Sequence, residues 1–192
     1  MRFLINLKNL IWIWWSNYHY KKIGAELHST AIDPSDTART MNSLLFLMNK
    51  LYDKFHYTKD GADLLYDAMI PPCEAYKQYR NGELKDDCDG FHSLVYHCLK
   101  FSGFEAYLLT ANSIKSGHCV VIFRMDYFWH VVDYNSIYTS TRTLETSIGE
   151  FNDYYSKKYC NGQKVLCNNL YSYDYKQGKF IMHNTKKMLE EY

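Results

Sequence analysis

The stretch "KDDCDGFHSLVYHCLKFSGFEAYLLTANSIKSGHCVVIFRMDYFWHVVDY" spans Lys85 to Tyr134 and carries the pattern that decides the predicted fold. Apolar residues keep helical spacing after Cys88 until Gly103, a residue type that commonly ends helices. Three segments rich in β-branched and aromatic residues follow, at 104–110, 117–125 and 127–135, and they are typical of strands. A helix followed by a small antiparallel sheet predicts the α+β class.

Cys88 stands at the start of the helical segment. Asp86 or Asp87 is a natural N-cap, which places Cys88 in the first turn. Backbone amides there lack helical partners, and together with the helix dipole they favour a thiolate and stabilise an oxyanion. Asp86, Asp87 and Asp89 oppose thiolate formation unless a cationic histidine offsets them. We therefore expect a nucleophile whose pKa is lowered by a nearby base.

The second and third strands are expected to form a hairpin with a tight turn near Asp126. If the loop has an even number of residues, Met125 lies opposite Phe128. Side-chain alternation then puts His118 and Asp133 on one face as diagonal neighbours, within reach of a hydrogen bond. An odd-numbered loop would reverse this parity.

A histidine oriented by a carboxylate is the base that a thiol nucleophile needs. The order of a cysteine at a helix start, a histidine at a strand start and an aspartate on the next strand predicts Cys88 as nucleophile, His118 as general acid and base, and Asp133 as the residue that orients His118. His130 and Cys119 are expected on the opposite face of the sheet.

The span from about residue 74 to 138 resembles the transglutaminase-like cysteine peptidase superfamily, of bacterial or phage type. The similar segments are "DDCDGF", "SGFEAYLL", "GHCVVIF" and "WHVVDYN". The resemblance implies a papain-like core, with the catalytic helix packed on a small antiparallel sheet and preceded by N-terminal helices. It also implies a thioester acyl-enzyme. The sequence shows no metal, nucleotide or flavin motif, so no metal or cofactor is expected. The tryptophan often found upstream in such members is not recognisable, so Gln78 is a weak candidate for oxyanion donor and the Cys88 amide a stronger one.

Three functions remain open at this point. The first is a protease, amidase or transamidase that acts on protein or peptide substrates, peptidoglycan among them. Within this class, "DCDGF" is also similar to the nucleophile motif of NlpC-type cell-wall endopeptidases, which would make His130 the orienting residue. The second is an inactive member used as a binding module, and the third is an assembly or membrane-surface component.

Composition limits the partners and the compartment. A chain of 192 residues is long enough for one compact domain, and a formal net charge of +1 provides no basic field for a nucleic-acid backbone. Six cysteines without a secretory leader favour reduced thiols and a cytoplasmic location. Cys160 and Cys167 flank an Asn-Gly turn and are the one pair that local loop closure would join.

The first 30 residues are expected to form an aromatic amphipathic helix and a linker, ahead of a catalytic domain at 31–192. Trp12 and Ile13 fall outside the main apolar stripe and are expected to be exposed. The helix is expected to dock on its own domain, with a partner chain or a membrane surface as alternatives. The stripe itself comprises Phe3, Leu4, Leu7, Leu10, Ile11, Trp14, Trp15 and Tyr18.

The remaining segments carry weaker signals. A helix with its cap near Ser35 and Asp36 is expected to run to about Phe55, and two short helices are expected between it and Gly82. The tail after about residue 178 is expected to be mobile. The other histidines, including His92 and His97, are expected to pack or to lie at the surface.

Overall fold

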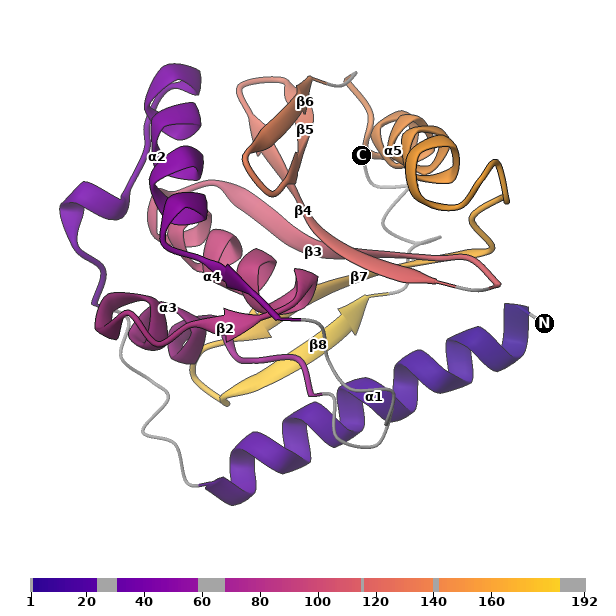
Figure 1. Ribbon diagram of the computed structural model, residues 1–192, viewed down its shortest axis with the longest axis horizontal. Helices are drawn as coiled ribbons and strands as arrows, with labels where there is room; N and C mark the ends of the chain where they lie inside the picture. Colours follow the sequence, from indigo (N-terminus) through magenta and orange to yellow (C-terminus); the bar gives the residue numbers. More distant parts are fainter. Residues whose placement is uncertain (1, 24–30, 59–67, 115, 140–141, 184–192) are drawn as a thin grey trace.

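The computed structural model describes residues 2–23, 31–58, 68–114, 116–139 and 142–183. These residues form an α+β fold around a six-stranded antiparallel sheet with the strand order β6-β5-β4-β3-β7-β8 (Figure 1). Its strands are β3 (Glu105–Asn112), β4 (Gly117–Met125), β5 (Phe128–Asp133), β6 (Ser136–Thr139), β7 (Cys167–Asp174) and β8 (Lys179–His183). The α-helices are α1 (Arg2–Ile23), α2 (Met41–Asp53), α3 (Pro72–Asn81), α4 (Cys88–Phe101) and α5 (Leu144–Tyr159), and β1 (His56–Tyr57) pairs in parallel with β2 (Lys85–Asp86).

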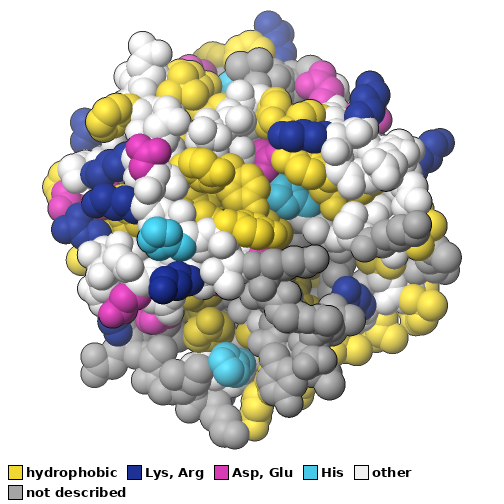
Figure 2. Space-filling model, viewed as in Figure 1, with side chains coloured by type: hydrophobic (Ala, Val, Ile, Leu, Met, Phe, Trp, Pro, Cys, Tyr) yellow, Lys and Arg dark blue, Asp and Glu magenta, His cyan; other side chains and the backbone are white. Residues whose placement is uncertain are grey.

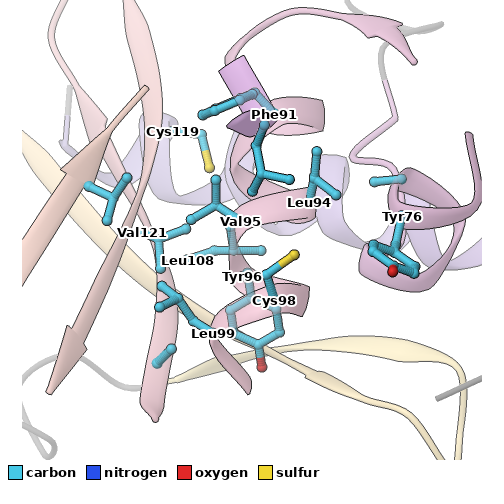
Figure 3. Packing of buried hydrophobic residues seen from close by; sticks show 14 of the residues in the cluster. Tyr76, Phe91, Leu94, Val95, Tyr96, Cys98, Leu99, Leu108, Cys119 and Val121 are labelled. Carbon is cyan, nitrogen blue, oxygen red and sulfur yellow. The ribbon is translucent and has the colours of Figure 1, made fainter. Parts of the chain in front are cut away.

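The sheet is buried on both faces, because successive strand residues belong to different cores. On one face, Leu108 and Val121 pack with α4 residues such as Val95 (Figure 3). On the other face, the neighbouring Leu109 and Val120 pack with α5, whose contributing residues are Leu144, Ile148, Phe151 and Tyr155. The central strands therefore read as continuous apolar runs rather than as alternating patterns.

The predicted hairpin register is confirmed. Met125 pairs with Phe128, and the two-residue loop between β4 and β5 places Asp126 at φ 55°. Aspartate tolerates this left-handed conformation better than most residues, which suits it to the turn. The start of β4 and the end of β5 consequently lie side by side, at the end of the sheet where α4 begins.

The predicted start of the helix near residue 35 is wrong. Pro34–Asp36 form a separate 3₁₀ turn, and α2 begins at Met41 with Thr40 and Ser43 in a reciprocal capping box. Asp36 is instead buried, where it pairs with Lys50 at 2.7 Å. A buried carboxylate needs such partners, so its polar contacts decide the conformation of this segment.

The predictions of two short helices and of a mobile tail are met only in part. The second predicted short helix is α3. The prediction of the first falls largely on 59–67, which are outside the described residues. The residues directly after Gly178 form β8, an edge strand that pairs with β7. The expectation of a mobile tail is therefore wrong for 179–183, where the alternation is too short to stand out from its polar surroundings, and 184–192 lie outside the described residues.

The prediction for the exposed side of α1 is wrong. Ile13 is buried and Trp12 is half-buried against Tyr171, whereas Phe3 and Trp14 of the predicted buried stripe are 75% and 63% exposed. No helix among the described residues is both long and apolar enough to cross a bilayer.

Hydrogen bonds at the edge of the sheet explain how α1 sits. Asn17 accepts a hydrogen bond from the backbone N–H of Phe180 at 2.7 Å and donates one to the carbonyl of the same residue at 3.0 Å. Ser16 accepts a hydrogen bond from the amide of Met69. Because these polar contacts need the face that carries Ser16, Asn17 and Ile13, the more apolar stripe is left outside.

Candidate active site

Cys88 is the first residue of α4, as predicted. Asp87 is the N-cap, and its carboxylate accepts a hydrogen bond from the Asp89 amide at 3.1 Å. The amide of Cys88 itself makes no hydrogen bond to any described residue, as is usual in the first turn of a helix. This amide is therefore available as an oxyanion donor beside the thiol.

Gly90 allows the acidic segment to fold against the first turn of α4. A Cβ atom at this position would lie 2.4 Å from the Cβ atom of Asp86. Such a separation is too short for two non-bonded carbon atoms. The close contact with Asp86 therefore explains why a glycine occupies this position of the "DDCDGF" segment. The close approach holds the turn that presents Cys88.

His118 and Asp133 are brought together as the register predicts. His118 Nε2 lies 2.8 Å from Asp133 Oδ1, and Asp133 is 3% exposed. Burial alone would raise the pKa of Asp133, but the hydrogen bond and charge of His118 lower it below its usual value. Since an ionised carboxylate can only accept, Nε2 carries the proton and Nδ1 of a neutral His118 is left as an acceptor.

The pair lies on the α5 face of the sheet. The ring of His118 stacks on Tyr155 with centroids 5.5 Å apart, and the hydroxyl of Tyr159 lies 3.5 Å from the other carboxylate oxygen of Asp133. Cys88 approaches the same end of the sheet from the α4 side. The dyad and the thiol thus meet where the strands end.

Cys88 and His118 line one pocket of about 670 Å³. The backbone N–H of Cys119 donates to Cys88 Sγ at 3.4 Å. Among the contacts of the described residues, however, no hydrogen bond joins Cys88 Sγ to His118. The structure therefore assembles the predicted dyad and places the thiol beside it, without a direct bond between them.

The expectation of a lowered thiol pKa is wrong for this arrangement. Burial is the largest cause that raises the pKa of Cys88 well above its ordinary value, followed by the charge of Asp87, then Cys119 and Asp89. The hydrogen bond from the Cys119 amide only partly offsets them. The resting thiol is consequently neutral near pH 7.

The acids beside Cys88 form a compact cluster. Carboxylate oxygens of Asp86, Asp87 and Asp89 lie within 4.8 Å of one another. This spacing would suit a divalent cation, but acidic clusters are common without one, and we assign no metal to it.

All six cysteines are free thiols, Cys160 and Cys167 among them, and Cys88 is the one that is not fully buried.

His92 belongs to the site, although the sequence suggested packing or a surface position. It is fully buried, and its Nδ1–H donates to the carbonyl of Cys88 at 2.5 Å. Its Nε2 accepts a hydrogen bond from the backbone N–H of Tyr134 at 3.1 Å. Burial is the main cause that lowers the pKa of His92 to about 4, so the ring is neutral at pH 7. The spacing of four residues on one helix indicates a contact between His92 and Cys88. The sequence does not indicate that the amide of Tyr134 is the second partner of His92.

Tyr134 follows Asp133 directly and adopts a left-handed conformation with φ 52°. This conformation is uncommon for an aromatic residue and costs energy that the surroundings must offset. Its ring packs against His92 and His118, with centroid distances of 5.1 and 6.0 Å. The strained turn thereby holds the end of β5 against the first turn of α4.

Two other predicted candidates are not brought to the site. Gln78 donates to Glu74 on its own helix at 3.2 Å and does not line the pocket, so the oxyanion role suggested for its side chain is not supported. His130 stacks on Phe123 with centroids 5.3 Å apart. It lies on the opposite face from Asp133, because the two are three residues apart on one strand.

Hydrophobic side chains gather near the middle of the face shown in Figure 2, next to a histidine. In the close-up of the α4 side, Cys119 points from β4 towards Val95 (Figure 3). The thiol of Cys119 is thus part of the core, one residue after His118.

No protein-family model matches the chain, and the search of curated proteins found no match either. The arrangement of Cys88, His118 and Asp133 is therefore interpreted from its own chemistry.

Proposed function

We propose that the protein is a thiol-dependent amide-bond hydrolase or acyl transferase that acts through a thioester on Cys88, in the manner of transglutaminase-like cysteine peptidases with a papain-like core. The observation that carries the proposal is the 2.8 Å contact between Asp133 and His118, a histidine that lines the same pocket as Cys88. A histidine oriented by a buried carboxylate, beside a cysteine at a helix N-terminus, is suited to acyl transfer.

In the first step, Cys88 Sγ attacks the carbonyl carbon of the substrate while its proton passes to Nδ1 of His118. Asp133 accepts from Nε2 and stabilises the imidazolium that results. The Cys88 amide donates to the oxyanion, and the leaving amine then takes the proton from His118 as the C–N bond breaks. The product of this step is a thioester with a neutral imidazole.

In the second step, water or an amine attacks the thioester, and His118 again accepts and returns the proton. Water gives hydrolysis and an amine gives transamidation. Because the pKa of Cys88 is raised, proton transfer accompanies the attack instead of preceding it in a resting ion pair. His118 must come within hydrogen-bonding distance of Sγ when the substrate is bound.

The arrangement favours Asp133 over His130 as the orienting residue, which favours a transglutaminase-like over an NlpC-type site. Protein or peptide acyl donors are the proposed substrates, and peptidoglycan peptides belong to this class. A binding module without catalysis is the alternative that the experiment below would reveal.

Exposure alone makes Cys88 the most accessible cysteine, so labelling with a thiol reagent does not test catalysis. A suitable assay is reaction with p-nitrophenyl acetate, with the acyl-enzyme followed by intact mass spectrometry and nitrophenolate followed by absorbance. We expect one acetyl group on Cys88, turnover by hydrolysis, and no adduct on that residue in Cys88→Ser. His118→Ala should slow acylation by about 10²- to 10⁴-fold while the fold is retained. Equal rates in the wild type and His118→Ala would leave the binding module as the function.

A further inference from the structure

The pocket at Cys88 has a second wall, formed by residues 4–15 of α1. Apolar side chains dominate this wall, with Lys8 and Asn9 among them; the apolar residues are Leu4, Leu7, Ile11, Trp12, Trp14 and Trp15. The opposite side carries the polar groups of the site, among them Cys88, His118 and Asp87. One cavity of about 670 Å³ therefore joins the proposed nucleophile to an apolar surface.

This volume lies in the range of cavities that bind a whole small ligand, which are mostly apolar with a few placed polar groups. Leu7 and Ile11 are 42% and 54% exposed. A bound apolar group would therefore remove part of their surface from water. Covering such surface with an apolar group is favourable, in proportion to the area removed from water.

The chemistry of the site indicates which part of a substrate occupies the pocket. The acyl group becomes covalently attached to Cys88 Sγ, so it must extend into the cavity that contains Sγ. The leaving amine is the part that becomes polar and protonated, and the carboxylates of Asp87 and Asp89 at the same end of the pocket complement it. The apolar wall is left for the acyl side.

We propose that α1 is a specificity wall, and that the enzyme prefers acyl groups with a large aliphatic or aromatic part next to the carbonyl that Cys88 attacks. This inference rests on the proposed function. Two sources share this chemistry, a fatty acyl chain and an apolar amino-acid side chain in a peptide. The reaction in the test is the same for both: an aryl ester and the Cys88 thiol give a thioester and the free phenol.

The test measures the second-order acylation rate of Cys88 with p-nitrophenyl esters of acetate, butanoate, hexanoate and octanoate, each divided by its rate with N-acetylcysteine. We expect the normalised rate to rise about two- to fourfold per methylene group until the pocket is filled. The ester of N-acetyl-phenylalanine, compared with octanoate, distinguishes a peptide source from a fatty acyl source. A normalised rate that does not change with chain length would overturn the proposal.

Two leucines of α1 provide a matched pair of variants. Leu7 lines the pocket and is 42% exposed, whereas Leu10 does not line it and is 48% exposed. Leu7→Asn should lower the ratio of octanoate to acetate rates about five- to tenfold, and Leu10→Asn should leave that ratio unchanged. Equal effects of the two substitutions, or an equal fall in the acetate and octanoate rates of Leu7→Asn, would refute the wall.

The outcomes for the two proposals are distinct. If no ester acylates Cys88, both the proposed function and the wall are refuted. If acetate acylates Cys88 through His118 but the chain-length series is flat, the proposed function stands and the wall alone is refuted. Circular dichroism of each variant checks that α1 is still folded.

Discussion

His92 makes the stability of the protein sensitive to mild acid. Its pKa is lowered to about 4 in the folded protein, mainly by burial, whereas the same group in an unfolded chain titrates near 6.5. Between these values the unfolded chain binds more protons on this residue than the folded chain does. The free energy of unfolding therefore falls as the pH decreases from 6.5 towards 4.

The size of the effect follows from the two pKa values. A difference of one pKa unit corresponds to about 1.4 kcal/mol, so His92 alone removes about 2–3 kcal/mol of stability between pH 7.5 and pH 4.5. His92→Gln provides the perturbation, because its amide can donate to the Cys88 carbonyl and accept from the Tyr134 amide without titrating. The variant should lose about 2–3 kcal/mol less than the wild type over this interval.

Urea denaturation followed by tryptophan fluorescence, at half-unit steps of pH, measures this difference. His97→Gln is the matched control, since burial also lowers the pKa of His97 to about 4, but this residue lies outside the site and contacts Tyr175. Both variants should flatten the pH dependence, while only His92→Gln should alter the acylation rate of Cys88. Parallel stability curves for the wild type and His92→Gln would refute the reasoning.

Three further predictions concern the site. Asp133→Asn should lower the acylation rate about 10²- to 10⁴-fold with an unchanged circular dichroism spectrum, and a larger loss in His130→Gln would contradict the assignment of the orienting residue. Gly90→Ala should destabilise the fold by about 1–3 kcal/mol through overpacking, measured by urea denaturation, and an unchanged midpoint would mean that the first turn of α4 adjusts freely. Iodoacetamide modification of Cys88 against pH, read by peptide mass spectrometry, should give an apparent pKa above the ordinary value, and Asp87→Asn should lower it because asparagine keeps the cap without the charge; an apparent pKa that does not respond would remove that carboxylate from the explanation.

The sequence predicts those parts of the site that local rules govern. The loop length between β4 and β5 and the two-residue alternation of strands are sufficient to pair His118 with Asp133. Capping chemistry is likewise sufficient to place Cys88 in the first turn of α4. These relations involve residues that are close in the chain or opposite in one hairpin.

The parts that sequence reasoning missed depend on partners far along the chain. His92 looks like an apolar-face residue of a helix until the amide of Tyr134 is known to face it. The seating of α1 depends on backbone groups of Phe180, which no periodicity in residues 2–23 encodes. The raised pKa of Cys88 depends on burial, which the acid-rich local sequence does not reveal.

The contact between Asn17 and Phe180 has a consequence for the association of the protein with itself. β8 is an edge strand, and edge strands offer unpaired backbone groups to other chains. Asn17 occupies both outward-facing backbone groups of Phe180, as a neighbouring strand would. A chain truncated before residue 21 would present this edge uncovered, and we expect it to form sheet-bonded aggregates that bind thioflavin T, whereas the full chain stays dispersed.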